Sequence, residues 1–109
     1  MILTIQKSIL ENILIHAGPF LEKKDTSQIT SHVFISALDS KLILKATDYE
    51  IGFCVEVNQI DVIQKGSTTA NGKKLLDIVK ILKNGNVKLE VINSTLHITQ
   101  GHSNFKLPM

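Results

Sequence analysis

Two glycines and a lysine are the residues of this sequence that come nearest to a chemical motif. Gly66, Gly72 and Lys73 have the residue types of a phosphate-binding loop, in which backbone N–H groups and a lysine hold nucleotide phosphates. The two glycines are one residue too far apart, and Lys74 stands where the motif requires a metal-binding serine or threonine. We therefore interpret this stretch as a connection between a strand and a helix.

The other reactive side chains do not form a catalytic or metal-binding pattern. Four histidines are present, namely His16, His32, His97 and His102. Their spacing matches neither the H-x-x-x-H nor the paired-cysteine pattern of zinc sites, and no serine lies in a nucleophile motif. Asp48 and Glu50 are close together, but in a turn such carboxylates usually cap backbone N–H groups. We expect no catalytic residue, no metal site and no cofactor.

The composition is that of a globular protein of the reducing cytoplasm. The 109 residues suffice for one domain, with 43% hydrophobic and 20% charged residues. Cys54 is the single cysteine and cannot form an internal disulfide. The sequence has no apolar run of the roughly 18 to 20 residues that span a membrane, and the N-terminus does not read as an export signal. We expect a cytoplasmic location and no membrane partner.

Lysine supplies all 12 basic residues, and the sequence contains no arginine. Lysine suits loose contact with phosphates, whereas arginine is the usual residue for bidentate reading of bases. A predicted helix over Lys73–Lys83 concentrates this charge, with four lysines against Asp77. Charge alone is compatible with a solvated helix face. The alternative is a surface that faces nucleic-acid phosphates without reading sequence.

The elements around these residues are predicted by a repeat. Val33–Phe53 aligns without a gap on Val87–Leu107, 54 positions later, with the apolar positions and the turn pairs Asp39-Ser40 and Asn93-Ser94 in register. Alternating apolar residues around a short polar turn predict a β-hairpin in each copy. The halves, about 1–57 and 58–109, each contain a strand, a helix and three antiparallel strands.

Two helices are predicted to cover the sheets. Ser8 and Glu11 have the spacing of a capping box at the start of the first helix, and Gly18-Pro19 ends it. Ile15 points out of its apolar stripe. Asn71 is the predicted N-cap of the second helix, and Asn84-Gly85 the predicted C-cap. The expected fold is α+β, with two helices packed on antiparallel sheets in two βαβββ halves.

In the order and spacing of its motifs, the whole chain resembles the first domain of the bacterial DNA polymerase III β subunits, the replicative sliding clamps. The resemblance rests on Leu3-Thr4-Ile5, Leu42-x-Leu44-x-Ala46-Thr47-Asp48-x-Glu50-Ile51, Lys73-Lys74-Leu75-Leu76-Asp77-Ile78 and Ser103-Asn104-Phe105-Lys106-Leu107. It implies the DNA-clamp fold and a non-catalytic processivity factor that encircles double-stranded DNA as a head-to-tail dimer of three-domain subunits. The second half lacks a counterpart of Cys54–Val57, so we expect a first domain truncated at its C-terminal end.

The resemblance also implies roles for particular residues. Lys73 and Lys80 would face the DNA backbone, with Lys7 and Lys24 as further candidates. Contact with the second clamp subunit would involve four residues near the far edge of the domain, Lys74, His102, Phe105 and Leu107. For Phe105 and Leu107 the alternative is a place in the core, because the repeat equates them with Ile51 and Phe53. Polymerase and clamp loader bind later domains in this family, so this chain is not expected to carry that groove.

Two departures from the family pattern concern packing and charge. Ser27-Gln28-Ile29-Thr30 replaces the usual apolar run after the first loop, and Asn104 stands where a basic residue is common. The rival hypothesis is a stand-alone small α+β binding module with no DNA role, whose lysine helix is merely solvated. A small enzyme has the least support, because the sequence shows no constellation of acid, base or nucleophile.

Overall fold

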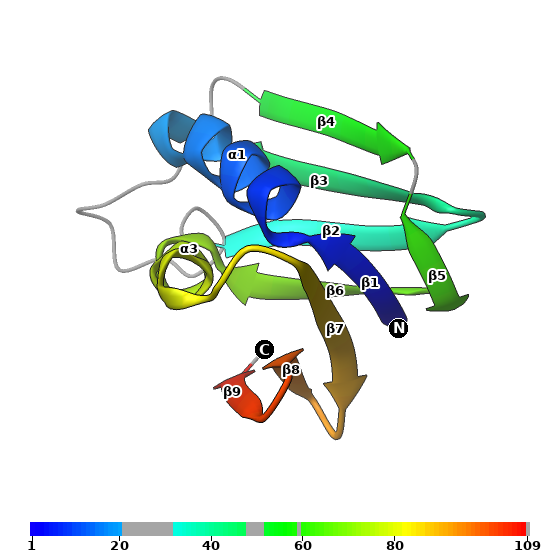
Figure 1. Cartoon of the computed structure of the whole chain (residues 1–109). Coiled ribbons are helices and arrows are strands. Elements are labelled where there is room, and N and C mark those ends of the chain that lie inside the picture. The colour runs from blue at the N-terminus through cyan, green and yellow to red at the C-terminus, as the bar shows by residue number, and fades with distance from the viewer. Residues whose placement is uncertain (21–31, 48–51, 59, 109) are drawn as a thin grey trace.

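The computed structural model describes residues 1–20, 32–47, 52–58 and 60–108. These residues form two α-helices, a short 3-10 helix and nine strands (Figure 1). In chain order the elements are β1 (Ile2–Gln6), α1 (Lys7–Ala17), η1 (Gly18–Phe20), β2 (His32–Leu38), β3 (Lys41–Thr47), β4 (Gly52–Asn58), β5 (Asp61–Gln64), β6 (Gly66–Asn71), α3 (Gly72–Ile81), β7 (Asn86–Ile92), β8 (Thr95–Gln100) and β9 (Ser103–Pro108). The predicted α+β class with two antiparallel sheets is confirmed.

The strands form two sheets, and the strand before each helix, β1 or β6, belongs to the sheet of the other half of the chain. One sheet has the order β5-β1-β7-β8-β9 and the other has the order β4-β3-β2-β6. Thus β1, from the first half of the chain, pairs with β7 of the second half, and β6, from the second half, pairs with β2 of the first. Each hairpin is therefore completed by a strand from the other half, and neither sheet can form from one half alone.

The predicted alternation of apolar residues places the core between the sheets and the helices. Val33 and Ile35 on β2 and the equivalent Val87 and Leu89 on β7 are completely buried. The returning strands β3 and β8 bury their alternate residues in the same way, at Leu42, Leu44, Leu96 and Ile98. Burying each such side chain contributes on the order of 1.5–3 kcal/mol, so strand register is fixed by the buried face.

Both helices cover this core and pack against each other. α1 buries Leu10, Ile13 and Leu14, and α3 buries Leu75 and Val79. Figure 1 shows α1 and α3 next to each other, each directly after the exchanged strand that precedes it. As predicted, Ile15 lies outside the buried stripe, with 49% of its surface exposed.

The beginning of α1 differs from the predicted capping box. The helix begins at Lys7, so Ser8 lies inside its first turn and Gln6 occupies the N-cap without a side-chain hydrogen bond. Glu11 pairs instead with Lys7, at 3.2 Å. The Lys7 N–H donates to the carbonyl of Gly85 at 2.8 Å. A tertiary bond thus satisfies an N–H group that a capping side chain satisfies in other helices.

The second helix begins as predicted and ends earlier. The Asn71 side chain accepts a 3.0 Å hydrogen bond from the Lys74 N–H, which confirms the N-cap. The helix ends at Ile81, because Leu82 has an extended backbone, so Asn84-Gly85 is not its C-cap. The short strand β5, which pairs with β1 across an irregular register, was not predicted. The turn Thr47–Glu50, apart from Thr47, and the segment 27–30 lie outside the described residues.

Asn71, which caps its helix, and Ser8, which does not, give a matched test of this assignment. Asn71→Ala should lower the free energy of unfolding by about 1 kcal/mol, because the Lys74 N–H loses its acceptor. Ser8→Ala should change it by less than about 0.5 kcal/mol, since Ser8 is exposed within the first turn and alanine favours helix. Urea unfolding of both variants measures the difference. Equal losses would show that Ser8 also caps a helix.

Candidate nucleic-acid and subunit interfaces

The exposed face of α3 carries a row of lysines. Lys73, Asp77 and Lys80 are exposed and lie on one side of the helix, because residues four and three positions apart share a face. Lys74 is exposed in the first turn, and Lys83 is exposed just after the helix. The buried residues Leu75 and Val79 lie on the opposite side against the core. This lysine face therefore points away from the sheets.

Most of the chain is close to neutral apart from this face. The chain carries a net charge of +2, while four lysines and Asp77 give the segment 73–83 a charge of +3. The rest of the chain therefore has a net charge of −1. On the sheets, lysines pair with acidic residues: Lys41 with Glu56 at 3.2 Å and Lys88 with Glu90 at 3.4 Å. Within the described residues, the ion pairs do not involve the lysines of α3.

Lys7 and Lys24, which the resemblance also assigned to DNA, differ from Lys73 and Lys80. The Lys7 side chain is only 14% exposed and forms an ion pair with Glu11. Its charge is therefore largely compensated within the first turn of α1. Lys24 lies outside the described residues. Of the four predicted DNA-facing residues, the structure brings Lys73 and Lys80 together on one exposed face.

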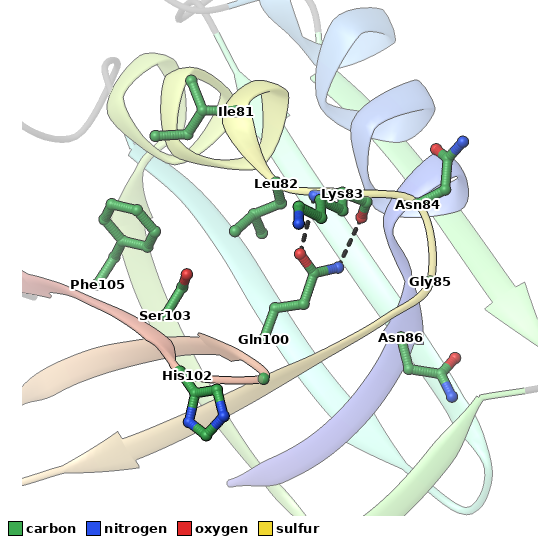
Figure 2. Close-up of a pocket in the computed structure, with 11 residues that line it drawn as sticks. Ile81, Leu82, Lys83, Asn84, Gly85, Asn86, Gln100, His102, Ser103 and Phe105 are labelled. Atoms are coloured by element: carbon green, nitrogen blue, oxygen red, sulfur yellow. Dashed lines mark hydrogen bonds between the residues drawn. The ribbon is translucent and has the colours of Figure 1, made fainter.

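A pocket lies between the end of α3 and the start of β9 (Figure 2). This α3–β9 pocket has a volume of about 500 Å³ and is lined by residues 81–86, 100–103 and 105. Ile81 is 68% exposed at its edge, and Phe105 is partly buried across from it. An exposed isoleucine beside a partly buried phenylalanine forms a small apolar area that is accessible to another molecule.

The predicted subunit-contact residues occupy this region unequally. His102 is exposed in the turn before β9, and both His102 and Phe105 line the α3–β9 pocket. Leu107 is 6% exposed and belongs to the hydrophobic core, so its side chain is turned away from solvent. Lys74 lies in the first turn of α3. Among the strands that the structure describes, β9 is at the edge of its sheet, with β8 on one side, and an outer edge of this kind can pair with another strand.

Gln100 links the two sides of the pocket and was not identified from the sequence. Its amide oxygen accepts from the Lys83 N–H at 2.8 Å, and its amide nitrogen donates to the Lys83 carbonyl at 2.6 Å (Figure 2). A glutamine at a strand end has no motif that reveals such contacts. Ile81 did carry a signal, because an isoleucine four residues after Asp77 falls on the polar side of the helix.

The titratable groups of the described residues do not suggest catalysis. The Lys65 ammonium lies 2.7 Å from the Asp39 carboxylate and lowers the pKa of Asp39. Both groups are exposed next to the β2–β3 turn, where such ion pairs contribute little stability. Among the described residues, no three histidine, cysteine, aspartate or glutamate side chains gather as metal ligands. The same residues include no helix long and apolar enough to cross a membrane.

Comparison with known proteins assigns this architecture to a family. The family model for the DNA polymerase III beta subunit, N-terminal domain, matches residues 1–109. The beta sliding clamp of Helicobacter pylori strain J99 is 42% identical over 107 residues, which cover 98% of this chain and 29% of that protein. The Caulobacter vibrioides beta sliding clamp is 33% identical over 111 residues, covering 98% of this chain and 29% of that protein.

Solved structures agree in fold. The Helicobacter pylori beta clamp bound to a DNA ligase peptide superposes with a TM-score of 0.96 at 42% identity, covering all of this chain and 30% of that one. Caulobacter crescentus pol III beta gives a TM-score of 0.93 at 32% identity, and the superposition covers 99% of this chain and 29% of that one.

The chain therefore has the α+β fold of a sliding-clamp domain, with two helices on two antiparallel sheets. It belongs to the DNA polymerase III beta subunit family, by a match to the N-terminal domain over its whole length. The chain spans about three tenths of the length of the curated relatives that it matches.

The apolar area at the β9 edge should make the isolated chain self-associate. Phe105→Ser should weaken this association at least several-fold, because it removes the aromatic ring from the α3–β9 pocket. Phe34→Ser is the matched control, since Phe34 is 38% exposed on β2 of the other sheet. Sedimentation equilibrium of the parent and both variants measures the effect. Unchanged association of Phe105→Ser would exclude this edge as the contact.

Proposed function

We propose that this chain is one domain of a ring-shaped sliding clamp that encircles duplex DNA and holds the replicative polymerase on it. The clamp does no chemistry in this role; it is an accessory subunit that raises processivity in the cytoplasm. The proposal includes the arrangement known for the family, in which two identical subunits of three domains join head to tail. The present chain would be the first of these domains, built from two repeated halves of about 1–57 and 58–109.

The lysine face of α3 is the observation that carries this proposal. Lys73 and Lys80 are exposed on either side of Asp77, and none of the ion pairs among the described residues involves them. The segment 73–83 carries a charge of +3, while the rest of the chain has a net charge of −1. A cation row on a rigid helix attracts the phosphate backbone over a Debye length of about 8 Å at physiological salt. Such attraction is independent of base sequence, as a sliding contact requires.

The use of lysine, and not arginine, fits movement along DNA. An ammonium group is a compact, strongly hydrated charge on a flexible stem, so it contacts phosphates loosely and through water. Arginine would form bidentate contacts with guanine edges and favour particular sequences. Lys73 and Lys80, two turns apart on α3, would present such loose contacts to the DNA backbone.

The contact between the two subunits, unlike the contact with DNA, has to be tight. A subunit contact must be specific and long-lived, and the α3–β9 pocket and the free edge of β9 offer apolar area and backbone hydrogen-bonding groups for it. We place the contact with the second subunit here, with Phe105 and His102 in the pocket and Leu107 supporting β9 from the core. Lys74, in the first turn of α3 and outside the pocket lining, would extend the contact along the helix. Polymerase and clamp loader would bind other domains of the same polypeptide.

Reversing charge on the lysine face tests the DNA role. Lys73→Glu combined with Lys80→Glu should weaken binding of the full-length clamp to duplex DNA. The slope of log K against log salt should also become shallower, by roughly one for each phosphate that is no longer neutralised. Fluorescence anisotropy with a linear duplex at several salt concentrations measures both quantities. Circular dichroism verifies that the variant remains folded.

The control for this experiment carries the same change in charge elsewhere. Lys45 and Lys88 are exposed on the outer faces of the two sheets, because their chain neighbours point into the core. Lys45→Glu with Lys88→Glu should leave the salt slope nearly unchanged. Equal effects of the two double variants would mean that overall charge, and not the α3 face, determines DNA binding.

A further inference from the structure

The connection between α3 and β7 is held in place from two sides. On one side, the Gly85 carbonyl accepts a 2.8 Å hydrogen bond from the Lys7 N–H at the start of α1. On the other side, the Gln100 side chain forms both of its bonds to the backbone of Lys83. Between these points the chain leaves the helix in an extended conformation, with ψ of 159° at Leu82. A segment of four residues is thus fixed to two different elements.

The Gln100 contact has the form of a pair of bonds between neighbouring strands. The amide offers one donor and one acceptor to one donor and one acceptor of the same residue, so both Lys83 backbone groups are satisfied at once. Gln100 is the last residue of β8, and only Gly101 and His102 separate it from β9. The amide therefore ties the end of α3 to the turn that introduces β9.

This tie fixes the spacing across the α3–β9 pocket. Ile81 comes two residues before Lys83, and Phe105 comes five residues after Gln100; the first lines the pocket from α3 and the second from β9 (Figure 2). Ile81 is the last residue of α3 and Phe105 lies on β9, so each residue is on an element that adjoins one end of the Gln100–Lys83 contact. An interface whose anchors are already arranged loses less conformational entropy when the partner binds.

We propose that Gln100 is a positioning residue for ring closure, whose side-chain amide presents Ile81 and Phe105 in a fixed arrangement to the second clamp subunit. This inference rests on the proposed function, in which the α3–β9 pocket belongs to the subunit contact. Glutamate cannot replace the residue, because a carboxylate cannot donate to the Lys83 carbonyl, and asparagine is one methylene group shorter.

The test compares subunit dissociation of full-length clamp rings by fluorescence energy transfer between labelled subunits. Gln100→Ala should accelerate dissociation about tenfold, equivalent to about 1.4 kcal/mol, and Gln100→Glu should act in the same direction. Gln64→Ala is the control, because Gln64 is exposed on β5 at the opposite edge of the same sheet and should have no effect. Hydrogen exchange of the Lys83 amide should quicken in Gln100→Ala alone.

A double-mutant cycle separates positioning from general stabilisation. If Gln100 acts by positioning Phe105, Gln100→Ala should accelerate dissociation much less in the Phe105→Ser background than in the parent. Equal acceleration in both backgrounds, or none in the parent, would overturn the inference. If Phe105→Ser itself left dissociation unchanged, the placement of the subunit contact would fail and this inference with it. Acceleration by Phe105→Ser without an effect of Gln100→Ala would refute the inference alone.

Discussion

The exchange of first strands between the two halves is the constraint on which the rest of this domain depends. β1 completes the sheet of the second hairpin, and β6 completes the sheet of the first. Each exchanged strand runs directly into a helix, so the exchange also brings α1 and α3 together. The hydrogen bond from Lys7 to Gly85 joins the start of one helix to the chain that follows the other. A shared helix layer over two sheets follows from this single topological feature.

Helix α3 contributes to two different surfaces, the exposed lysine face and the α3–β9 pocket. The face of α3 that points away from the sheets is charged and exposed, and lysine is in general a strongly hydrated charge on a flexible side chain. The end of the same helix, beside β9, is held by the Gln100 amide and carries apolar side chains. In the proposed ring, the first surface lets DNA move and the second prevents the subunits from separating. One ten-residue helix contributes to both.

The predictable part of the fold was the part that burial determines. Alternation fixed the hairpins, since Val33, Leu42 and their equivalents must reach the core. The cap at Asn71 was predictable because its bond is local. The capping box predicted at Ser8 was wrong, because the first N–H of α1 donates its hydrogen bond to the carbonyl of Gly85, which is far away in sequence. β5 carries little burial, with Val62 only partly covered, so alternation could not reveal it.

The candidate site also has a part that could be predicted from the sequence and a part that could not. The lysines of α3 were visible as a pattern of charge at helical spacing, and Phe105 as an apolar residue on a predicted edge strand. The α3–β9 pocket was not visible, because it depends on where α3 ends and on a hydrogen-bond pair spanning 17 residues. For Leu107 the sequence left two interpretations open, subunit contact and core, and its 6% exposure supports the core interpretation that the repeat had indicated.

Topological retention on DNA tests the central claim most directly. Full-length clamp would be loaded on a closed circular duplex by its clamp loader, washed at high salt, and assayed before and after the circle is cut once. A ring that encloses DNA should remain bound to the circle at high salt and dissociate rapidly after cutting, because its weak phosphate contacts cannot hold it. Retention that falls with salt and is equal on circular and cut DNA would contradict the account.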